Sequence, residues 1–524
     1  MASGSKKSEA RVKALLSSRI AYIAVLWAMM SGVDVVWHMG KAQYDYGGAF
    51  FWIMYTALLF LVVIPGIIAE SAMGAYARKS APAALKSILG DKYEYVGWLI
   101  TITCWAFTAY FVVWTSHALA YMVFSLKFLI EGAPPSFPDF WAEYACSWWP
   151  FIFSMVSWIL MWFVMIRGVA SLEKIALYSR PILFILLLLV AIMGLQSLPD
   201  FTQGVFFVVH PNPEILFDVA AWAAMITMIV WRLGPGFGVY ATFASYLPKG
   251  GEITDSNILP AFLDMALCYA ASFVVFGLMI GAHQLPMEYE DLAFTAVPAG
   301  FYLIKGGALA AFLFYLLMYL LGFTCAATFI EMIGSTLMDK FGVSRKMFTT
   351  VVIFWCIVAS IFYTIPIPDE WGGSLGFRVL YVSDYYDGVV TLISALIETI
   401  VLAYIWGAEK IRRFANETGD IKLPSWYFNT CLKVVAPILM FFGFAYEIIW
   451  PLLENPPEEA IACLGLAGGL VYLASYFILP YIMWKVSEDK FDRAVLYTTI
   501  LIIVTNLLLT LLGYYSIKIG ILSG

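Results

Sequence analysis

The sequence predicts an all-helical polytopic membrane protein with about 13 transmembrane helices. Its 524 residues are 62% hydrophobic and only 13% charged, whereas a soluble domain carries roughly 25% charged residues. The apolar runs are mostly 18 to 28 residues long. Such runs are long enough for helices that cross a hydrocarbon layer of about 30 Å, and they are too long and continuous for barrel strands.

Each predicted span is one apolar run bounded by polar residues. The runs cover residues 19–38, 48–76, 94–127, 149–166, 177–197, 215–246, 257–282, 306–338, 347–366, 385–406, 428–452, 460–485 and 493–516.

The connections between spans alternate in charge. Lysine and arginine gather in one set, for example around Lys13, Arg78 and Arg413, whereas the opposite set is acidic. The positive-inside rule then predicts a multi-pass protein of the plasma membrane with a cytoplasmic N-terminus. An odd number of spans puts the C-terminus outside. No cleavable signal peptide precedes the first span, and the pI of about 5.4 gives no reason to expect a nucleic-acid partner.

Enzyme chemistry has no support in the motifs. The seven cysteines are scattered without CxxC spacing, and we interpret them as small apolar residues in the packing. No zinc-like cluster or phosphate-binding glycine loop occurs. We expect no enzyme activity and no organic cofactor or catalytic metal.

Two spans are interrupted by residues that weaken a helix. The first span contains Ser31-Gly32-Val33-Asp34, and the sixth contains Arg232-Leu233-Gly234-Pro235-Gly236. Proline removes a backbone donor and glycine permits non-helical angles, so the helical ladder should open at both places. Opened backbone at membrane depth is tolerated where it faces a cavity or a solute. Paired interruptions five spans apart indicate a transporter binding site; the simpler alternative is a kink that only helps two helices pack.

Several segments together resemble one transporter family. The second span contains GGAF, a proline and GIIAESAMG, the link before span five reads RGVASLEKIALYSRPILF, and the sixth span reads LGPGFGVYATFASY. LGFTCAATFIE and SRK lie in and after span eight, and YVSDYYD precedes span ten. In order and spacing these segments resemble the neurotransmitter:sodium symporter family over about residues 15 to 480.

The resemblance implies two inverted repeats of five helices, with the solute held mid-membrane between broken spans one and six. We accordingly divide the chain into a cytoplasmic segment (1–18), a first repeat (19–200), a second repeat (201–410) and C-terminal helices (411–524). The resemblance also implies alternating access coupled to sodium. Glu70 matches a family glutamate that accepts amide hydrogens from the unwound sixth span near Pro235 and Gly236.

The gates implied by the resemblance are kept on the cytoplasmic side and altered outside. Lys13 or Arg11 would bridge Asp339 beside Tyr246. Outside, His38 replaces a family arginine opposite Asp387, or opposite Asp384 if the alignment slips by a turn. A histidine beside a carboxylate suggests a pH-sensitive gate; a neutral interfacial histidine is the simpler interpretation.

The first sodium site departs most from the family pattern. Arg232 aligns with a family threonine ligand, Asp264 aligns with an asparagine, and Asp34 lies at or one residue from another asparagine. A charge at mid-membrane costs about 3 kcal/mol on insertion scales, so Arg232 needs anionic partners. A planar guanidinium can serve two carboxylates. We therefore expect an Arg232–Asp34–Asp264 cluster where a sodium ion would bind.

The other ion positions are partly kept. Thr324 matches a hydroxyl ligand of the second sodium site, but Cys325 replaces its serine neighbour, and a thiol is a poor ligand for a hard cation. Tyr55 matches a chloride ligand, whereas Met228 and Cys268 replace polar ones. Sodium near Thr324 remains a candidate, and chloride dependence is not expected.

The substrate chamber implied by the resemblance is aromatic and nearly lacks polar groups. Such a set of rings also fits ordinary core packing. The expected substrate-binding residues are Gly32, Phe107, Phe111, Trp231, Gly234, Phe237, Cys325 and Phe329.

We predict a secondary transporter of a small amino acid or related organic solute, in which sodium coupling through the first site is weak or absent. The remaining driving forces are sodium at Thr324, protons on Asp34 or Asp264, or the solute gradient. A sodium symporter that uses only the second site is an alternative. A transport-inactive membrane subunit or receptor, and a channel-like leak, are the others. Lipids are expected neighbours, and the sequence does not define an oligomeric state.

Overall fold

The computed structural model describes residues 16–284, 292–368, 373–449, 473–487 and 489–518. Within these ranges the regular elements are helical, and the one pairing of extended backbone is an isolated bridge between Pro368 and Ser374. The predicted all-helical class is confirmed. The basic segment before Leu16, with Lys13 and Arg11, lies outside the described residues.

Nine helices in the described part of the chain are long and apolar enough to cross a membrane, and three bent pairs raise the number to twelve. A further apolar helix covers Leu473–Val486, within predicted span 460–485, whose first part lies outside the described residues. The predicted thirteen spans therefore correspond to these twelve and this helix. The nine continuous helices are Gly48–Ala77, Asp91–Glu131, Ser171–Ser197, Thr254–Gly281, Gly307–Phe341, Arg345–Tyr363, Leu375–Ala415, Ser425–Glu447 and Phe491–Leu512.

The elements of the first half run as follows: α1 (Arg19–Met30), η1 (Val33–Val35), α2 (His38–Tyr46), α3 (Gly48–Leu58), η2 (Leu59–Val63), α4 (Ile64–Ala77), α5 (Ala81–Leu89), η3 (Asp91–Tyr93), α6 (Glu94–Glu131), α7 (Phe137–Ala145), α8 (Trp149–Met165), α9 (Val169–Ser197), α10 (Phe201–Val209) and η4 (Pro213–Phe217).

The second half and the C-terminal helices comprise α11 (Val219–Leu233), α12 (Val239–Ala244), α13 (Thr254–Gly281), η5 (Leu292–Ala296), α15 (Val297–Leu303), α16 (Gly307–Phe341), α17 (Arg345–Tyr363), α18 (Leu375–Ile400), η6 (Val401–Gly407), α19 (Ala408–Ala415), α20 (Ser425–Thr430), η7 (Cys431–Val435), α21 (Ala436–Phe444), η8 (Ala445–Ile449), η9 (Ile482–Val486) and α24 (Phe491–Lys518).

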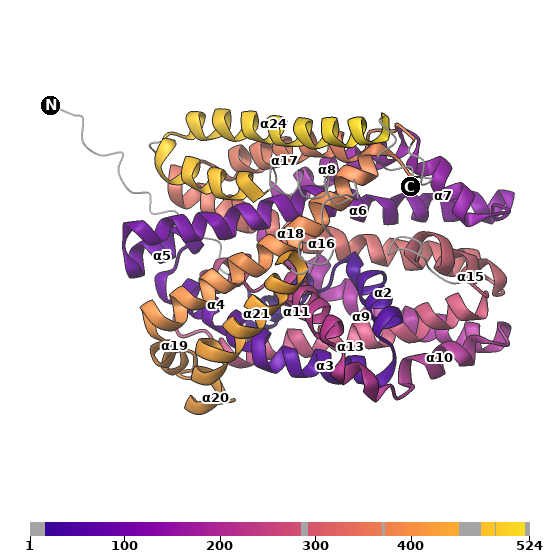
Figure 1. Ribbon diagram of the computed structural model, residues 1–524, viewed down its shortest axis with the longest axis horizontal. Coiled ribbons are helices and arrows are strands. Elements are labelled where there is room, and N and C mark those ends of the chain that lie inside the picture. The colour runs from indigo at the N-terminus through magenta and orange to yellow at the C-terminus, as the bar shows by residue number, and fades with distance from the viewer. Residues whose placement is uncertain (1–15, 285–291, 369–372, 450–472, 488, 519–524) are drawn as a thin grey trace.

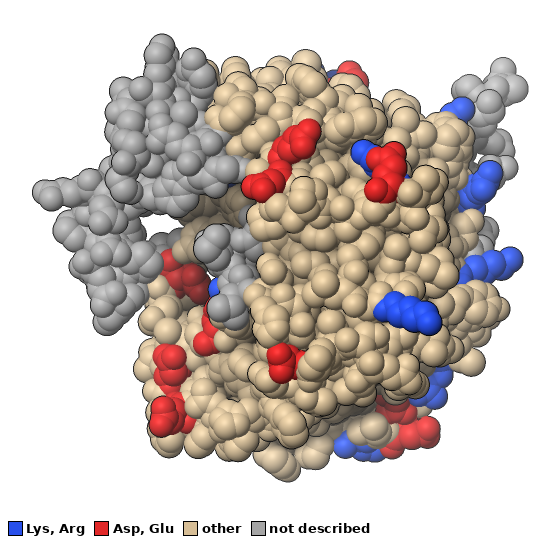
Figure 2. Space-filling view, turned by 90° about the vertical axis from the view of Figure 1, so that its right-hand side faces the viewer, with Lys and Arg blue, Asp and Glu red and all other residues tan. Residues whose placement is uncertain are grey.

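The long helices run roughly side by side, so the bundle has two ends (Figure 1). Short helices mark each end. We call the end with α5, α19 and α20 the α5 end, and the end with α7, α10 and α15 the α7 end. Figure 2 shows the α7 end face on: most of the visible surface is uncharged, with separate acidic and basic side chains rather than one continuous charged patch.

The centre of the bundle is formed by α6, which packs against α16, α8, α18 and α17. The most apolar window of its span is 89% buried, whereas that of α24 is 28% buried. A helix that is apolar all round but poorly covered by protein suits a lipid-facing position. The last helix is therefore an outer layer, packed on α17 and α18, and it joins the core only through a few side chains such as Ala494 and Leu509.

Several helices extend beyond the apolar runs that predicted them. α9 begins at Val169 instead of residue 177, and the continuous helix of span ten covers Leu375–Ala415 instead of 385–406. Helical hydrogen bonding continues past the hydrocarbon layer because it satisfies backbone groups in either solvent. An apolar run marks only the part of a helix that is in contact with lipid or with the protein core.

Candidate substrate and ion site

Helix breaks occur at both predicted places. α1 ends at Met30, and the chain turns through η1 into α2 with a bend of 64°. α11 ends at Leu233, where Gly234 has a left-handed φ of 65° and caps the helix by donating to the Val230 carbonyl. At Gly236 the φ is 90°, and an added Cβ would lie 2.7 Å from backbone atoms of Ala395. Glycine is required there by both conformation and space.

The backbone groups freed at the second break have identified partners. Glu70 on α4 accepts hydrogen bonds from the amides of Gly236, at 3.0 Å, and Ala241, at 3.2 Å. Ser394 on α18 donates to the Gly236 carbonyl at 3.0 Å. The Tyr240 hydroxyl donates to the Leu233 carbonyl. Glu70 suits these amides because orphan amide donors in a buried site favour a carboxylate acceptor.

The carbonyls freed at the first break accept hydrogen bonds from Arg180, a residue that the sequence analysis did not single out. Arg180 on α9 is fully buried and donates through Nη2 to the carbonyls of Ala28, at 3.0 Å, and Ser31, at 3.2 Å. The Cys325 thiol on α16 donates to the Met29 carbonyl at 3.0 Å. The available signal was an arginine inside the apolar fifth span, the same signal that drew attention to Arg232.

Arg232 lies between the two predicted carboxylates with no solvent exposure of its side chain. Its Nη1 and Nη2 donate to the two oxygens of Asp264 at 2.5 and 2.9 Å. Its Nε lies 2.5 Å from Asp34 Oδ2, an ion-pair contact without hydrogen-bond alignment. Ser31 also donates to Asp264 at 2.7 Å. Three charged side chains from α11, η1 and α13 thus meet at the two breaks.

Two residues that we assigned to the chloride position also contact this guanidinium. Tyr55 accepts from Arg232 Nη1 at 2.9 Å, and the Cys268 sulfur accepts from Nη2 at 2.8 Å. Both terminal nitrogens of Arg232 thereby donate to polar atoms of α3 and α13, and Nε lies against Asp34 on η1. Met228 lies elsewhere and lines the cavity toward the α7 end.

The aromatic residues predicted for the chamber pack directly on one another. Phe107 stacks on Phe111 at 4.9 Å between ring centroids and lies 4.8, 5.1 and 5.4 Å from the rings of Phe329, Phe237 and Trp231. A Cβ added to Gly32 would lie 2.6 Å from the Phe111 ring, and one added to Gly234 would lie 2.7 Å from the Phe237 ring. The rings therefore fill the space between the two breaks.

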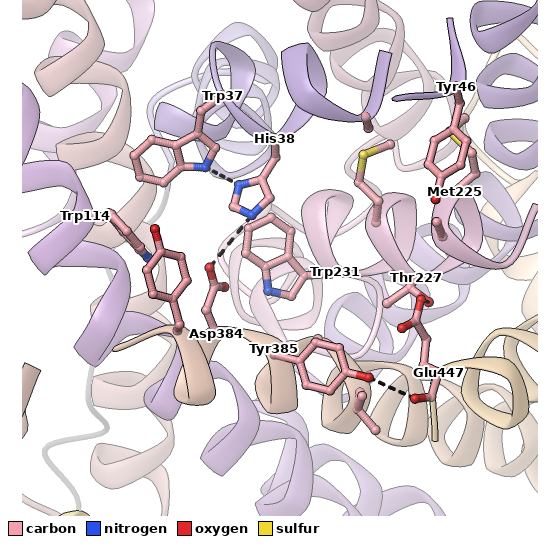
Figure 3. Close-up of a pocket in the computed structure, with 16 residues that line it drawn as sticks. Trp37, His38, Tyr46, Trp114, Met225, Thr227, Trp231, Asp384, Tyr385 and Glu447 are labelled. Carbon is pink, nitrogen blue, oxygen red and sulfur yellow. Dashed lines mark hydrogen bonds and ion pairs between the residues drawn. The ribbon is translucent and has the colours of Figure 1, made fainter. Parts of the chain in front are cut away.

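A cavity of about 360 Å³ lies beside Trp231 (Figure 3). His38 lies between Trp37, whose indole donates to it, and Asp384. The His38 ring is 4.7 Å from that of Trp231. Asp384 and Glu447 also line the cavity, which includes no lysine or arginine among the described lining residues.

The predicted pairing of His38 with Asp387 is wrong, and the alternative partner Asp384 is the one found. His38 Nε2 lies 3.8 Å from Asp384 Oδ2. Asp387 lies one helical turn further along α18 and accepts instead from Tyr110, at 3.0 Å, and Tyr476, at 2.5 Å. Two tyrosine donors satisfy the buried carboxylate, so it does not need the histidine.

At the α5 end, Tyr246 is part of an ionic cluster different from the expected one. Its hydroxyl donates to Glu331 at 2.8 Å, and Arg345 contacts both Glu331 oxygens at 2.6 and 2.7 Å. Asp339 accepts from the Ser80 amide at 2.8 Å. The expected basic partners of Asp339 precede Leu16 and lie outside the described residues.

Nearby, the α5 helix ends in a charged cluster. Lys86 contacts Glu94 at 2.7 Å and Asp91 at 2.9 Å. Hydrogen bonds to these carboxylates raise the pKa of Lys86 above its usual value. The lysine is therefore a permanent cation at this end of the molecule.

The Thr324 hydroxyl contacts carbonyls of its own helix. It donates toward Leu320 and Leu321 at 2.8 and 3.1 Å. Its neighbour Cys325 bonds the first break, as described above. The contact of α16 with the first break is therefore made by the Cys325 thiol.

Comparison with known proteins agrees with this architecture. A solved structure of MhsT in complex with L-phenylalanine has the same fold, with a TM-score of 0.73 and 20% identity; the match covers 82% of this chain and 99% of that one. Two helix breaks that lie together, with Arg232 between them, are the arrangement of a membrane transporter of the inverted-repeat class.

The Sodium:neurotransmitter symporter family model matches residues 145–456, more than half of the chain. This chain belongs to that family. An uncharacterized sodium-dependent transporter of Methanocaldococcus jannaschii is 27% identical over 81% of this chain and 88% of its own length. The human sodium- and chloride-dependent GABA transporter 2 is 22% identical over 88% of this chain and 85% of its own length. A sodium- and chloride-dependent betaine transporter of Caenorhabditis elegans is 22% identical over 84% of this chain and 82% of its own length.

Proposed function

We propose that this protein carries a small amino acid or a related small organic solute by alternating access, with Arg232 in place of the first sodium ion. The observation that supports this most directly is the contact of Arg232 with Asp34 and Asp264 at the two helix breaks. In a symporter a sodium ion enters and leaves with the solute. Arginine is held covalently and does not lose its proton in proteins, so the first site cannot couple transport to sodium.

The cavity beside Trp231 supports a solute with an apolar body and an amine. Its walls carry tryptophan and tyrosine rings, and its acidic groups are Asp384 and Glu447. A protonated amine is attracted both by carboxylates and by the faces of aromatic rings. Relatives named for GABA and betaine carry solutes with a cationic nitrogen, in line with this preference.

The mechanism follows from the position of each gate. The solute would enter from the α7 end, pass His38 and Trp231, and displace the phenylalanine rings that now fill the space between the breaks. Separation of Arg345 and Tyr246 from Glu331 would then open the α5 end. The connections at the α5 end of the bundle carry the basic residues, so we assign that end to the cytoplasm.

Protons are one candidate for coupling. Two carboxylates share one guanidinium in the cluster, which leaves an excess negative charge when both are ionised. Binding a proton on Asp34 or Asp264 would cancel that charge. The second ion position and the solute gradient are the other candidates.

The test is uptake of radiolabelled amino acids and small amines into proteoliposomes with sodium, potassium or choline outside. We expect uptake to survive replacement of sodium and to increase with an inward proton gradient. Strict dependence on sodium would contradict the assignment of Arg232. Arg232→Thr provides the matched comparison: it should be stabilised by sodium in a thermal-shift assay, whereas Arg413→Thr, at an exposed arginine, should behave like the wild type.

A transport-inactive membrane subunit or receptor is a second candidate, and the ring packing around Phe107 favours it. The same solute screen separates the two. Binding with no uptake indicates a receptor, and neither binding nor uptake indicates a structural subunit.

A further inference from the structure

A second arginine is buried beside the first helix break, and among the described residues it forms no direct ion pair with a carboxylate. Arg180 is fully buried. In the described residues its polar contacts are the Ser179 hydroxyl at 2.9 Å and the two carbonyls at the end of α1. Nε has no hydrogen-bond partner. A cation inside a membrane protein costs several kcal/mol unless its surroundings compensate it, so its neighbourhood must favour positive charge.

The end of α1 provides such surroundings. The last turn of a helix presents carbonyls without intrahelical partners and carries the negative end of the helix dipole. The Ala28 and Ser31 carbonyls are among these, and both accept from Arg180 Nη2. In broken-helix transporters, half-helix C-terminal ends and unwound carbonyls are the groups that coordinate the driving cation. Arg180 therefore occupies a place built for a cation.

On the side opposite α1, this cation position is bounded by α16. Cys325 reaches the same break and donates its thiol hydrogen to the Met29 carbonyl. Thr324, its neighbour, directs its hydroxyl hydrogen to its own helix. A hard cation such as sodium prefers oxygen ligands, and the thiol removes one of them. A guanidinium needs only acceptors, which the carbonyls supply.

We propose that Arg180 is the resident cation of the second ion position, between α1 and α16, and that the transport cycle uses no sodium ion there. The proposal deepens the proposed function, in which this position was the remaining candidate for sodium coupling. With Arg232 at the first position and Arg180 at the second, both sites hold a cation that cannot dissociate. The driving force is then reduced to protons or the solute gradient.

The tethered cation also has a mechanical consequence. α1 is bonded to α9 through Arg180 and to α13 through Ser31 and Asp264. Here α1 must break the Arg180 contacts to move, or must move together with α9.

The test rebuilds the oxygen site that the chain lacks. Arg180→Ala removes the resident cation and Cys325→Ser restores a hydroxyl next to Thr324. The purified double variant is heated in sodium, potassium or choline chloride, without solute. A ligand that binds only the folded state raises the melting temperature in proportion to the logarithm of its concentration. We expect that rise for sodium in the double variant and no difference among the salts for the wild type.

The matched controls keep the resident cation. Cys325→Ser alone and Arg180→Lys should fold and remain insensitive to sodium. A folded double variant with no sodium response would overturn the proposal, because the carbonyls and hydroxyls would then not form a cation site.

If the double variant does not fold, a measurement on the wild-type protein tests the proposal instead. Hydrogen exchange of the amides of residues 28–34 is measured in sodium and in choline. Equal protection supports the proposal, and protection that increases with sodium contradicts it. These measurements need neither solute nor transport, so the proposed function can fail in the uptake assay while this result stands, and the reverse also holds.

Discussion

The charge balance around Arg232 is the dominant feature at the residue scale. The guanidinium contacts Asp34 and Asp264 and is fully removed from solvent. The removal of one partner from a buried ion pair leaves an uncompensated charge, which is far more costly than the loss of an exposed pair. The position of the charges, more than their number, sets the energetic consequence of each substitution.

Arg232→Met should lower the free energy of unfolding by about 3–5 kcal/mol, because two buried carboxylates then face each other without a cation. Asp264→Asn should cost less, about 1–3 kcal/mol, since the Arg232 pair with Asp34 remains. The double variant should lose less than the sum of the two. Detergent-titrated unfolding followed by tryptophan fluorescence measures all three.

An exposed ion pair supplies the control for the comparison of the two single variants with the double variant. Arg413 contacts Glu409 at 2.9 Å, but its side chain is 76% exposed. Arg413→Met should change stability by no more than about 1 kcal/mol. Strictly additive losses for Arg232→Met and Asp264→Asn would show that the two side chains are not coupled.

At the scale of the elements, the central question is how a broken helix is held open inside a bundle. α11 stops at Leu233 and α12 resumes at Val239. The intervening backbone is stabilised by Glu70 from α4 and Ser394 from α18. The break is therefore a property of three helices together, and glycine only makes it sterically feasible.

Glu70→Gln should loosen the second break. A glutamine offers one acceptor and turns donors toward the Gly236 and Ala241 amides, so at least one amide loses its partner at a cost of about 1–3 kcal/mol. We expect faster hydrogen exchange over residues 234–241. Ser394→Ala removes one bond to the Gly236 carbonyl and should have a smaller effect, about 1 kcal/mol. Unchanged exchange in Glu70→Gln would contradict a supporting role.

For the whole molecule, the two ends of the bundle differ in how they are closed. The cavity at the α7 end narrows at His38 and Trp231, with a 3.8 Å contact to Asp384. The α5 end is closed by a charge-assisted cluster in which Arg345 makes two hydrogen bonds to the fully buried Glu331. The stronger contacts lie at the α5 end, so the structure represents a state closed there.

Arg345→Met should shift the population toward opening at the α5 end. The lost pair is worth at least about 1.4 kcal/mol, which corresponds to about a tenfold change in the equilibrium. Ser335→Cys, at a fully buried position on α16, reports the opening through its reaction with a water-soluble maleimide. We expect about tenfold faster labelling with Arg345→Met. The same rate as in an Arg413→Met background would rule out the cluster as a gate.

Some properties of this protein could be predicted from its sequence alone. Apolar runs long enough to cross a bilayer predict the helical class because lipid leaves backbone groups no other partner. The Gly-Pro-Gly interruption after Arg232 predicts a break for local steric reasons, and the isolation of Arg232 among apolar residues predicts carboxylate partners on energetic grounds. These inferences depend only on the chemistry of residues that are close together in the sequence, so the sequence alone is enough to make them.

The tertiary structure decided which groups meet across the bundle. Asp384 and Asp387 are one helical turn apart on α18, so only the packing of α18 against α2 and α6 could pair one with His38 and the other with Tyr110. Arg180 is more than 140 residues from the carbonyls that it binds, and a position in the fifth span gives no indication of its partner. The phenylalanines of the chamber fit a lined cavity and a filled one equally well in sequence. Their mutual contacts, and not their identities, show that the rings fill it, because packing depends on the distances between helices and not on composition.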